Sequence, residues 1–235
     1  MTQFIIAMII LIGTICIGIP ISYSMGITGL LYILITNPSY IVIVPNRLFA
    51  GIDQFQLLSI PFFLMAADIM VHSDISGKLF QFVKLFVGRF RGGLAFVNVV
   101  VSTIFGSISG TALGDVAALG KIEMNEMDKE GYDENFSCAL TAASSMQSPL
   151  VPPSNIAVLY ASVMGLSVGA MFLSGLLPGI LLGMSQIMYI LLIRKRRNFP
   201  ASFRTLTVKQ AVRIIIDGII TMGMPIIIIG GTLGG

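Results

Sequence analysis

Apolar residues run along most of this chain in long stretches that short polar or charged segments separate. The stretches 4–20, 22–36, 55–71 and 168–193 resemble membrane helices, for which roughly 20 apolar residues cross a hydrocarbon core of about 30 Å, and a last apolar run covers 218–235. The basic run 194–197 directly follows one stretch, which the positive-inside rule places in the cytoplasm. The pattern predicts an all-α polytopic membrane protein with multiple transmembrane helices.

Residues 76–91 show a different pattern, in which basic residues alternate with apolar and aromatic ones. This spacing predicts an amphipathic helix. It lies in the plane of the membrane interface, or its charged face meets water, and periodicity alone does not separate the two.

Composition supports the membrane assignment. Of 235 residues 55% are hydrophobic and 11% are charged, against about 25% charged in ordinary soluble domains. The net charge of +3 is too small to indicate a nucleic-acid groove. The two cysteines, Cys16 and Cys138, lie in apolar stretches and do not form a disulfide framework or a metal cluster. Residues 1–46 carry no charged side chain, so the N-terminus is predicted to be a retained membrane segment.

Small polar residues gather inside two charge-free regions, 92–114 and 135–193. The first cluster, GSISGT, follows an apolar run at 94–105 and precedes a second short run at 116–122. Each run is shorter than a full crossing. We therefore predict a re-entrant helical hairpin whose tip lies near Ser107 to Thr111, buried in protein or lining a wet cavity.

The second cluster, TAASSMQSPLVPPSN, contains three prolines. Because proline has no N–H, Pro149, Pro152 and Pro153 should release the carbonyls of Ser145, Ser148 and Pro149 from helical bonding. Unpaired carbonyls at membrane depth are costly unless a donor or cation meets them, and small hard cations prefer oxygen ligands. Interrupted transporter helices bind Na⁺ or H⁺ in this way.

The same residues also allow other structural and functional interpretations. Small residues also let membrane helices pack closely, although close packing does not require three prolines. Asp115 is either the N-cap of the helix that follows it or a residue that supports a site. His72 beside Ser73 and Asp74 would be the only base for a membrane enzyme, but adjacency in sequence is not a catalytic triad. A channel would also line its path with hydroxyls and carbonyls.

Three blocks in these regions resemble the large membrane subunit of tripartite ATP-independent periplasmic (TRAP) transporters. They are RLFAGIDQFQLLSIPFFLMAADIM at 47–70, GRFRGGLAFVNVVVSTIFGSISGTALGDVAALG at 88–120 and TAASSMQSPLVPPSNIAVLY at 141–160. They occur in the order and spacing of that family, and the resemblance covers essentially the whole chain.

The resemblance implies a Na⁺-coupled secondary transporter in the bacterial inner membrane that is not an enzyme. Its substrate would be an organic acid, a carboxylate such as a sialic acid or a dicarboxylate. The implied partners are a small membrane subunit, a periplasmic substrate-binding protein and the lipid bilayer, and no nucleic acid. The fold would be the first repeat of an elevator-type, inverted-repeat transporter, in which a transport domain slides against a scaffold.

Mapped onto this chain, the family's organisation implies five segments. They are scaffold transmembrane helices (1–75), an amphipathic interfacial helix (76–91), a transport-domain part with the hairpin and an unwound helix (92–165), a transmembrane helix with a cytoplasmic basic end (166–206), and an amphipathic connector with the start of a second repeat (207–235). Family members are about twice as long. We therefore expect this sequence to be the N-terminal half of a subunit.

The resemblance also implies roles for individual residues. It places Na⁺ ligands at Ser107, Ser109, Ser145, Met146, Ser148 and Pro149, substrate contacts at Gly110, Thr111, Ser154 and Asn155, and supporting residues at Asp115 and Gln147. The segment 146–148 departs from the family, where small or branched residues ending in glycine are more common, so ligation by the Gln147 side chain stays open.

Overall fold

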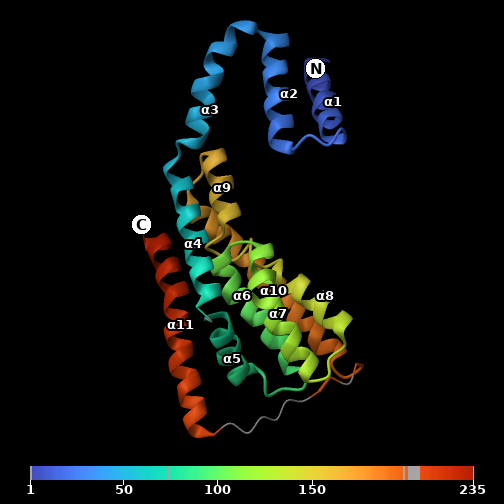
Figure 1. Cartoon of the computed structure of the whole chain (residues 1–235), viewed down its shortest axis with the longest axis vertical. Coiled ribbons are helices and arrows are strands. Elements are labelled where there is room, and N and C mark those ends of the chain that lie inside the picture. Colours follow the sequence, from blue (N-terminus) through green and yellow to red (C-terminus); the bar gives the residue numbers. More distant parts are fainter. Residues whose placement is uncertain (1, 74, 198, 201–206, 235) are drawn as a thin grey trace. The chain divides into compact units, whose positions relative to one another are not determined.

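A computed structural model describes residues 2–73, 75–197, 199–200 and 207–234 of the chain (Figure 1). The described residues contain helices and no strand, which confirms the predicted all-α class. The chain divides into two compact units, Met1–Gln54 and Phe55–Gly235. The boundary falls inside the segment predicted as scaffold.

The first unit consists of α1 (Thr2–Cys16), α2 (Ile21–Thr36), the 3₁₀ helix η1 (Pro38–Ile43) and α3 (Val44–Ile52). The helix expected over 4–20 ends earlier, because the chain turns at Gly18, whose φ of 93° lies in the left-handed region. Helices α1 and α2 pack together. Most large apolar side chains of this unit are exposed, as expected of surfaces that face lipid or another protein.

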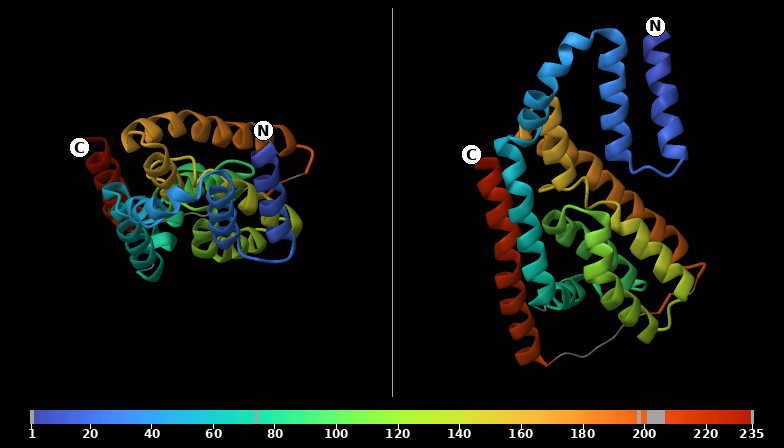
Figure 2. Two further views of the ribbon diagram at one scale, coloured as in Figure 1. Left: turned by 90° about the horizontal axis from the view of Figure 1, so that it is seen from above. Right: turned by 45° about the horizontal axis from the view of Figure 1, so that its top comes forward.

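The second unit carries the predicted hairpin and helix break. Its elements are η2 (Phe55–Leu58), α4 (Ser59–His72), α5 (Ile75–Val87), α6 (Gly93–Ser109), α7 (Ala112–Lys129), α8 (Glu134–Ser145), α9 (Asn155–Met164), α10 (Val168–Ile193) and α11 (Val208–Gly234). Helix α6 contacts α5, α7, α8 and α10. Helix α10 runs along one side of this cluster (Figure 2).

The core of the second unit surrounds α6. Leu94, Ala95, Phe96 and Val97 are all buried, and four successive residues of an α-helix point to all of its sides. A helix that is apolar all round belongs in the interior of a protein. The other helices of the unit are therefore organised around the first arm of the hairpin.

Helix α5 is amphipathic, as predicted. Its Leu79 and Phe80 are fully buried in the core that includes α6. On its polar side Lys84 forms ion pairs of 2.9 Å with Glu126 and 3.1 Å with Glu130, near the charged end of α7. Partial burial raises the pKa of Glu126, but hydrogen bonds from Lys84 and Lys129 outweigh that effect and hold the pKa below its ordinary value.

Helix α10 begins and ends at the predicted residues. By length and composition it is the one single helix of the described ranges that is long and apolar enough to cross a bilayer. Helix α7 is longer than the apolar run 116–122, since charged residues that favour helix extend it to Lys129. The second arm of the hairpin therefore extends beyond the apolar run at 116–122.

Candidate functional site

The hairpin turns at the predicted tip. Helix α6 ends at Gly110, whose φ of 62° is left-handed, and the Thr111 side chain accepts a hydrogen bond of 3.1 Å from the Gly114 N–H to cap α7. The arms have 17 and 18 residues. The second arm is apolar only over 116–122, which is too short for a full crossing and is compatible with a re-entrant hairpin.

The hairpin tip lies against the break between α8 and α9. A methyl group at Gly106 would lie 2.7 Å from the Ser148 Cα, and one at Gly110 would lie 2.8 Å from the Asn155 backbone nitrogen. The Asn155 amide also donates to the Ser109 carbonyl over 3.2 Å. The two polar clusters identified in the sequence therefore meet at one junction between the hairpin tip and the α8–α9 break.

The break between α8 and α9 runs from residue 146 to residue 154. Of the three carbonyls expected to be free, that of Ser145 accepts from the Ser148 N–H at 3.0 Å, and that of Pro149 accepts from the Ser154 hydroxyl at 2.6 Å. The expectation is wrong for these two, because a tight turn and a side chain supply the donors. Among the described residues no donor reaches the Ser148 carbonyl, so only that one is free.

The predicted Na⁺ ligands lie in this junction with one exception. Ser107, Ser109, Ser145 and Ser148 are buried, whereas the Met146 side chain is 57% exposed and could contribute only its backbone. The Ser107, Ser109 and Ser145 hydroxyls donate to backbone carbonyls at 2.5, 3.2 and 2.9 Å. A hydroxyl that donates its proton still offers lone pairs to a cation.

The predicted substrate residues Gly110, Thr111, Ser154 and Asn155 also meet at this junction. Ser154 caps α9 by accepting from the Ala157 N–H at 3.2 Å, in addition to its bond to Pro149. Its side chain is therefore committed to the backbone. The Asn155 Oδ1 is buried and unpartnered among the described residues, so it is free to accept a hydrogen bond.

Asp115 is 1% exposed and is not the cap of α7, because Thr111 occupies that position. The interpretation of Asp115 as the N-cap is therefore wrong. Its carboxylate faces the hydroxyls of Ser102 and Ser148. The Asp115 Oδ1 and the Ser148 Oγ are buried and lack an assigned hydrogen bond within the described part of the chain. The alternative, that Asp115 supports a site, stays a prediction.

A buried polar network next to the junction was not predicted. Glu123 is fully buried on α7 and accepts hydrogen bonds of 2.8 Å from Asn98 and 3.1 Å from Thr141. Ser144 donates to the Asn98 side-chain oxygen over 2.8 Å and accepts from Ser102 over 3.1 Å. The signal was available in the polar positions 98 and 102, one turn apart in an apolar helix.

The Gln147 side chain is engaged by other protein side chains. Its side chain accepts from Thr103 at 2.6 Å and donates to Gln186 at 2.8 Å, so both ends of the amide have protein partners. Neither Thr103 nor Gln186 was identified from the sequence.

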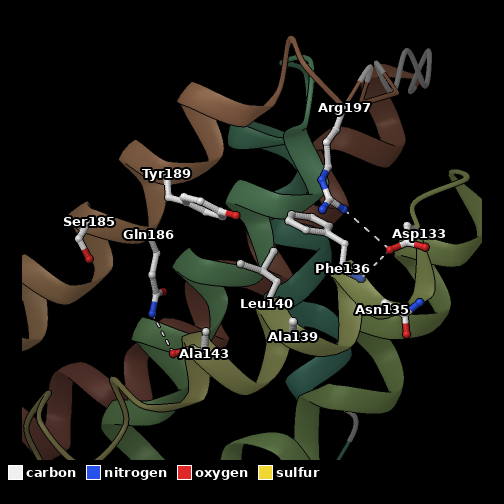
Figure 3. A pocket seen from close by; sticks show the side chains of 10 residues that line it. All are labelled: Asp133, Asn135, Phe136, Ala139, Leu140, Ala143, Ser185, Gln186, Tyr189 and Arg197. Carbon is white, nitrogen blue, oxygen red and sulfur yellow. Dashed lines mark hydrogen bonds and ion pairs between the residues drawn. The ribbon is translucent and has the colours of Figure 1, made fainter.

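A groove of about 480 Å³ lies between α8 and α10, apart from the hairpin tip (Figure 3). Tyr189, Leu140 and Phe136 line it, and Arg197 lies 5.7 Å above the Phe136 ring centre and 3.9 Å from Asp133. Gln186 lies at its other end, where it donates to the Ala143 carbonyl.

The described residues also bear on two other kinds of site, a metal cluster of ionisable side chains and an enzyme site at 72–74. Within the described residues no three His, Cys, Asp or Glu side chains gather in a way that could hold a metal ion, so a cation there would depend mainly on hydroxyl and carbonyl oxygens. Of the group at 72–74, the hydroxyl of Ser73 donates to the Ile69 carbonyl at 2.5 Å. Asp74 and the side chain of His72 lie outside the described part of the chain.

Comparison with known proteins gives a consistent picture. Residues 8–235 match the family described as the tripartite ATP-independent periplasmic transporter, DctM component. The chain is 34% identical over 227 residues to the sialic acid TRAP transporter large permease protein SiaM of Vibrio cholerae, covering 95% of this chain and 52% of the relative. It is 32% identical over 228 residues to the C4-dicarboxylate large permease protein DctM of the same organism, covering 97% and 50%.

A further relative is the uncharacterised protein YgiK of Salmonella typhimurium, 35% identical over 240 residues, with 99% of this chain and 55% of the relative covered. The chain therefore spans about half the length of the curated relatives it matches.

Proposed function

The chain belongs to the DctM family of TRAP transporters, and from this premise we propose that it forms part of a large permease subunit that imports an organic acid together with Na⁺. Relatives in the family are transporter permeases rather than enzymes. A carboxylate substrate is proposed because two relatives are named for sialic acid and C4-dicarboxylates.

One observation supports Na⁺ coupling above the others. The hairpin tip and the α8–α9 break are in van der Waals contact and together hold buried serine hydroxyls, the free Ser148 carbonyl and the Asp115 carboxylate. Oxygen atoms of these kinds suit a small hard cation, and interrupted membrane helices supply them where backbone bonding fails. We assign Na⁺ binding to Ser107, Ser109, Ser148 and the backbone of 145–149.

The substrate is assigned to the adjacent surface of Gly110, Thr111 and Asn155. The Asn155 Oδ1 can accept from a hydroxyl of the substrate. The first residues of a helix have N–H groups without an intrahelical partner, so the N-terminus of α7 favours an anion. A carboxylate near Thr111 is consistent with both features.

We further propose that the subunit acts in the bacterial inner membrane with a small membrane subunit and a periplasmic binding protein. The motion would be of the elevator type, with the hairpin and helix break inside the moving body. The shared core of α5 to α8 around α6 supports movement of these helices as one unit.

The test is uptake of labelled substrate by proteoliposomes that contain the full-length subunit with both partners. We expect uptake to require a Na⁺ gradient and to fail when K⁺ or Li⁺ replaces Na⁺. Ser107→Ala and Ser109→Ala should raise the Na⁺ concentration for half-maximal uptake without preventing membrane insertion. Equal uptake in all three cations would refute the coupling, and non-saturable current at fixed voltage would favour a channel.

A further inference from the structure

Helix α10 carries glycines at 175, 179 and 183, one turn apart, that face the α8–α9 break. A methyl group at Gly175 would lie 2.6 Å from the Leu150 carbonyl oxygen, and one at Gly179 would lie 2.7 Å from a Val151 methyl carbon. A methyl group at Gly183 would lie 2.7 Å from the Gln147 Oε1. The broken segment therefore rests against the backbone of α10.

A chain of hydrogen bonds crosses this contact in one direction. The Thr103 hydroxyl of α6 reaches two acceptors, the Gln147 Oε1 at 2.6 Å and the Val99 carbonyl of its own helix at 2.7 Å. Gln147 in turn donates to Gln186 of α10 at 2.8 Å. Gln186 then donates to the carbonyl of Ala143 in the last turn of α8 over 2.8 Å (Figure 3). Gln147 is fully buried, so the loss of a partner leaves a polar group without compensation.

The position of Gln147 connects this chain of bonds to the proposed Na⁺ site. Among the described residues its neighbour Ser148 has a carbonyl that no donor reaches and a hydroxyl that faces the Asp115 carboxylate, and it lies against Gly106 of α6. A peptide whose side chain is fixed to α6 and α10 has little freedom to rotate. The oxygens of Ser148 are therefore held in place by an amide whose own oxygen and nitrogen are bonded to protein side chains.

We propose that Gln147 and Gln186 are positioning residues that set the Na⁺ affinity of the junction by fixing the peptide at Ser148. The inference rests on the proposed function. The inference also gives α10 a role in cation affinity, because its Gln186 side chain is bonded to Gln147.

The test uses Gln147→Met and Gln186→Met in the full-length subunit with its partners, since methionine keeps the length of the side chain and removes the amide. Each single variant should raise the Na⁺ concentration for half-maximal uptake about fivefold, in line with the loss of one buried hydrogen bond. The KM for substrate at saturating Na⁺ should stay unchanged, which a general packing defect would not allow. In the double variant the Na⁺ concentration for half-maximal uptake should rise no further than in either single variant, because Gln147 and Gln186 belong to one chain of hydrogen bonds.

Ser185→Ala is the matched control. Ser185 is exposed, adjoins Gln186 and bonds to the carbonyl of Leu182 in its own helix at 2.7 Å, so Na⁺ dependence should not change. Should a methionine variant fail to insert, Thr103→Val tests the other end of the chain of bonds and should shift the Na⁺ dependence in the same direction.

The outcomes separate the two proposals. Na⁺-independent uptake by the wild type refutes the proposed function and the inference with it. Na⁺-dependent uptake that Gln147→Met, Gln186→Met and Thr103→Val leave unchanged, or that Ser185→Ala shifts equally, refutes the inference alone.

Discussion

Gly106→Ala tests the contact between the hairpin and the α8–α9 break. The added methyl carbon would lie 2.7 Å from the Ser148 Cα, closer than non-bonded carbons approach each other. In a helix, alanine is favoured over glycine by about 1 kcal/mol, whereas overpacking a tight contact costs typically about 1–3 kcal/mol. The net effect should be destabilising by up to about 2 kcal/mol.

Gly120→Ala is the matched control on the other arm of the hairpin. There a methyl group would meet the side chains of Val116 at 3.4 Å and Thr141 at 3.7 Å, which needs little or no displacement. The higher helix propensity of alanine over glycine then dominates, and the variant should be as stable as the wild type or more stable.

The assay is thermal unfolding of the purified full-length subunit in detergent, with and without Na⁺. Gly106→Ala should lower the transition temperature. It should also weaken the stabilisation by Na⁺, because the added methyl group displaces Ser148, a proposed Na⁺ ligand. If both alanine variants match the wild type in stability and Na⁺ response, the close contact at Gly106 is refuted.

Three further changes have defined outcomes. Thr111→Ala removes the side-chain cap of α7 and should lower stability by about 1 kcal/mol, measured by thermal unfolding. Glu123→Ala leaves buried donors without an acceptor and should destabilise by about 3 kcal/mol or more, whereas a neutral effect would contradict the network. The pKa of Glu126 is lowered when the protein is folded, so its contribution to stability is present above the unfolded pKa and is lost as pH falls through the folded value. Glu126→Gln should flatten the decline in stability at acidic pH, and an unchanged pH profile would show that the Lys84 pair does not contribute.

Local signals allowed much of the fold to be predicted. Helix α10 has a capping residue, Ser167, directly before its apolar run and a basic cluster directly after it, so both ends were readable. The hairpin tip was readable because Gly110 permits a left-handed turn between two short apolar runs.

The errors concern local hydrogen bonding. Asp115 was expected as a possible cap, but Thr111, which the sequence analysis did not consider for this role, caps α7 because it directly precedes the first turn. The prolines did interrupt the helix, but a tight turn and Ser154 satisfied two of the three carbonyls. A count of prolines gives the position of a break and not the pairing inside it.

The contacts of Gln147 could not be predicted, because they depend on which helices meet. Thr103 and Gln186 are far apart in sequence, and their pairing with Gln147 follows from the packing of α6 and α10 on the broken segment. A lone glutamine in the apolar helix α10 was nonetheless a usable signal, since polar side chains at membrane depth usually find partners.

The most direct test of the central claim is the influx of radioactive Na⁺ that accompanies substrate uptake in proteoliposomes with the complete transporter. We predict that substrate and its binding protein together stimulate Na⁺ influx, and that Ser107→Ala and Ser109→Ala raise the Na⁺ concentration this influx requires. Substrate accumulation without any Na⁺ influx would contradict the account.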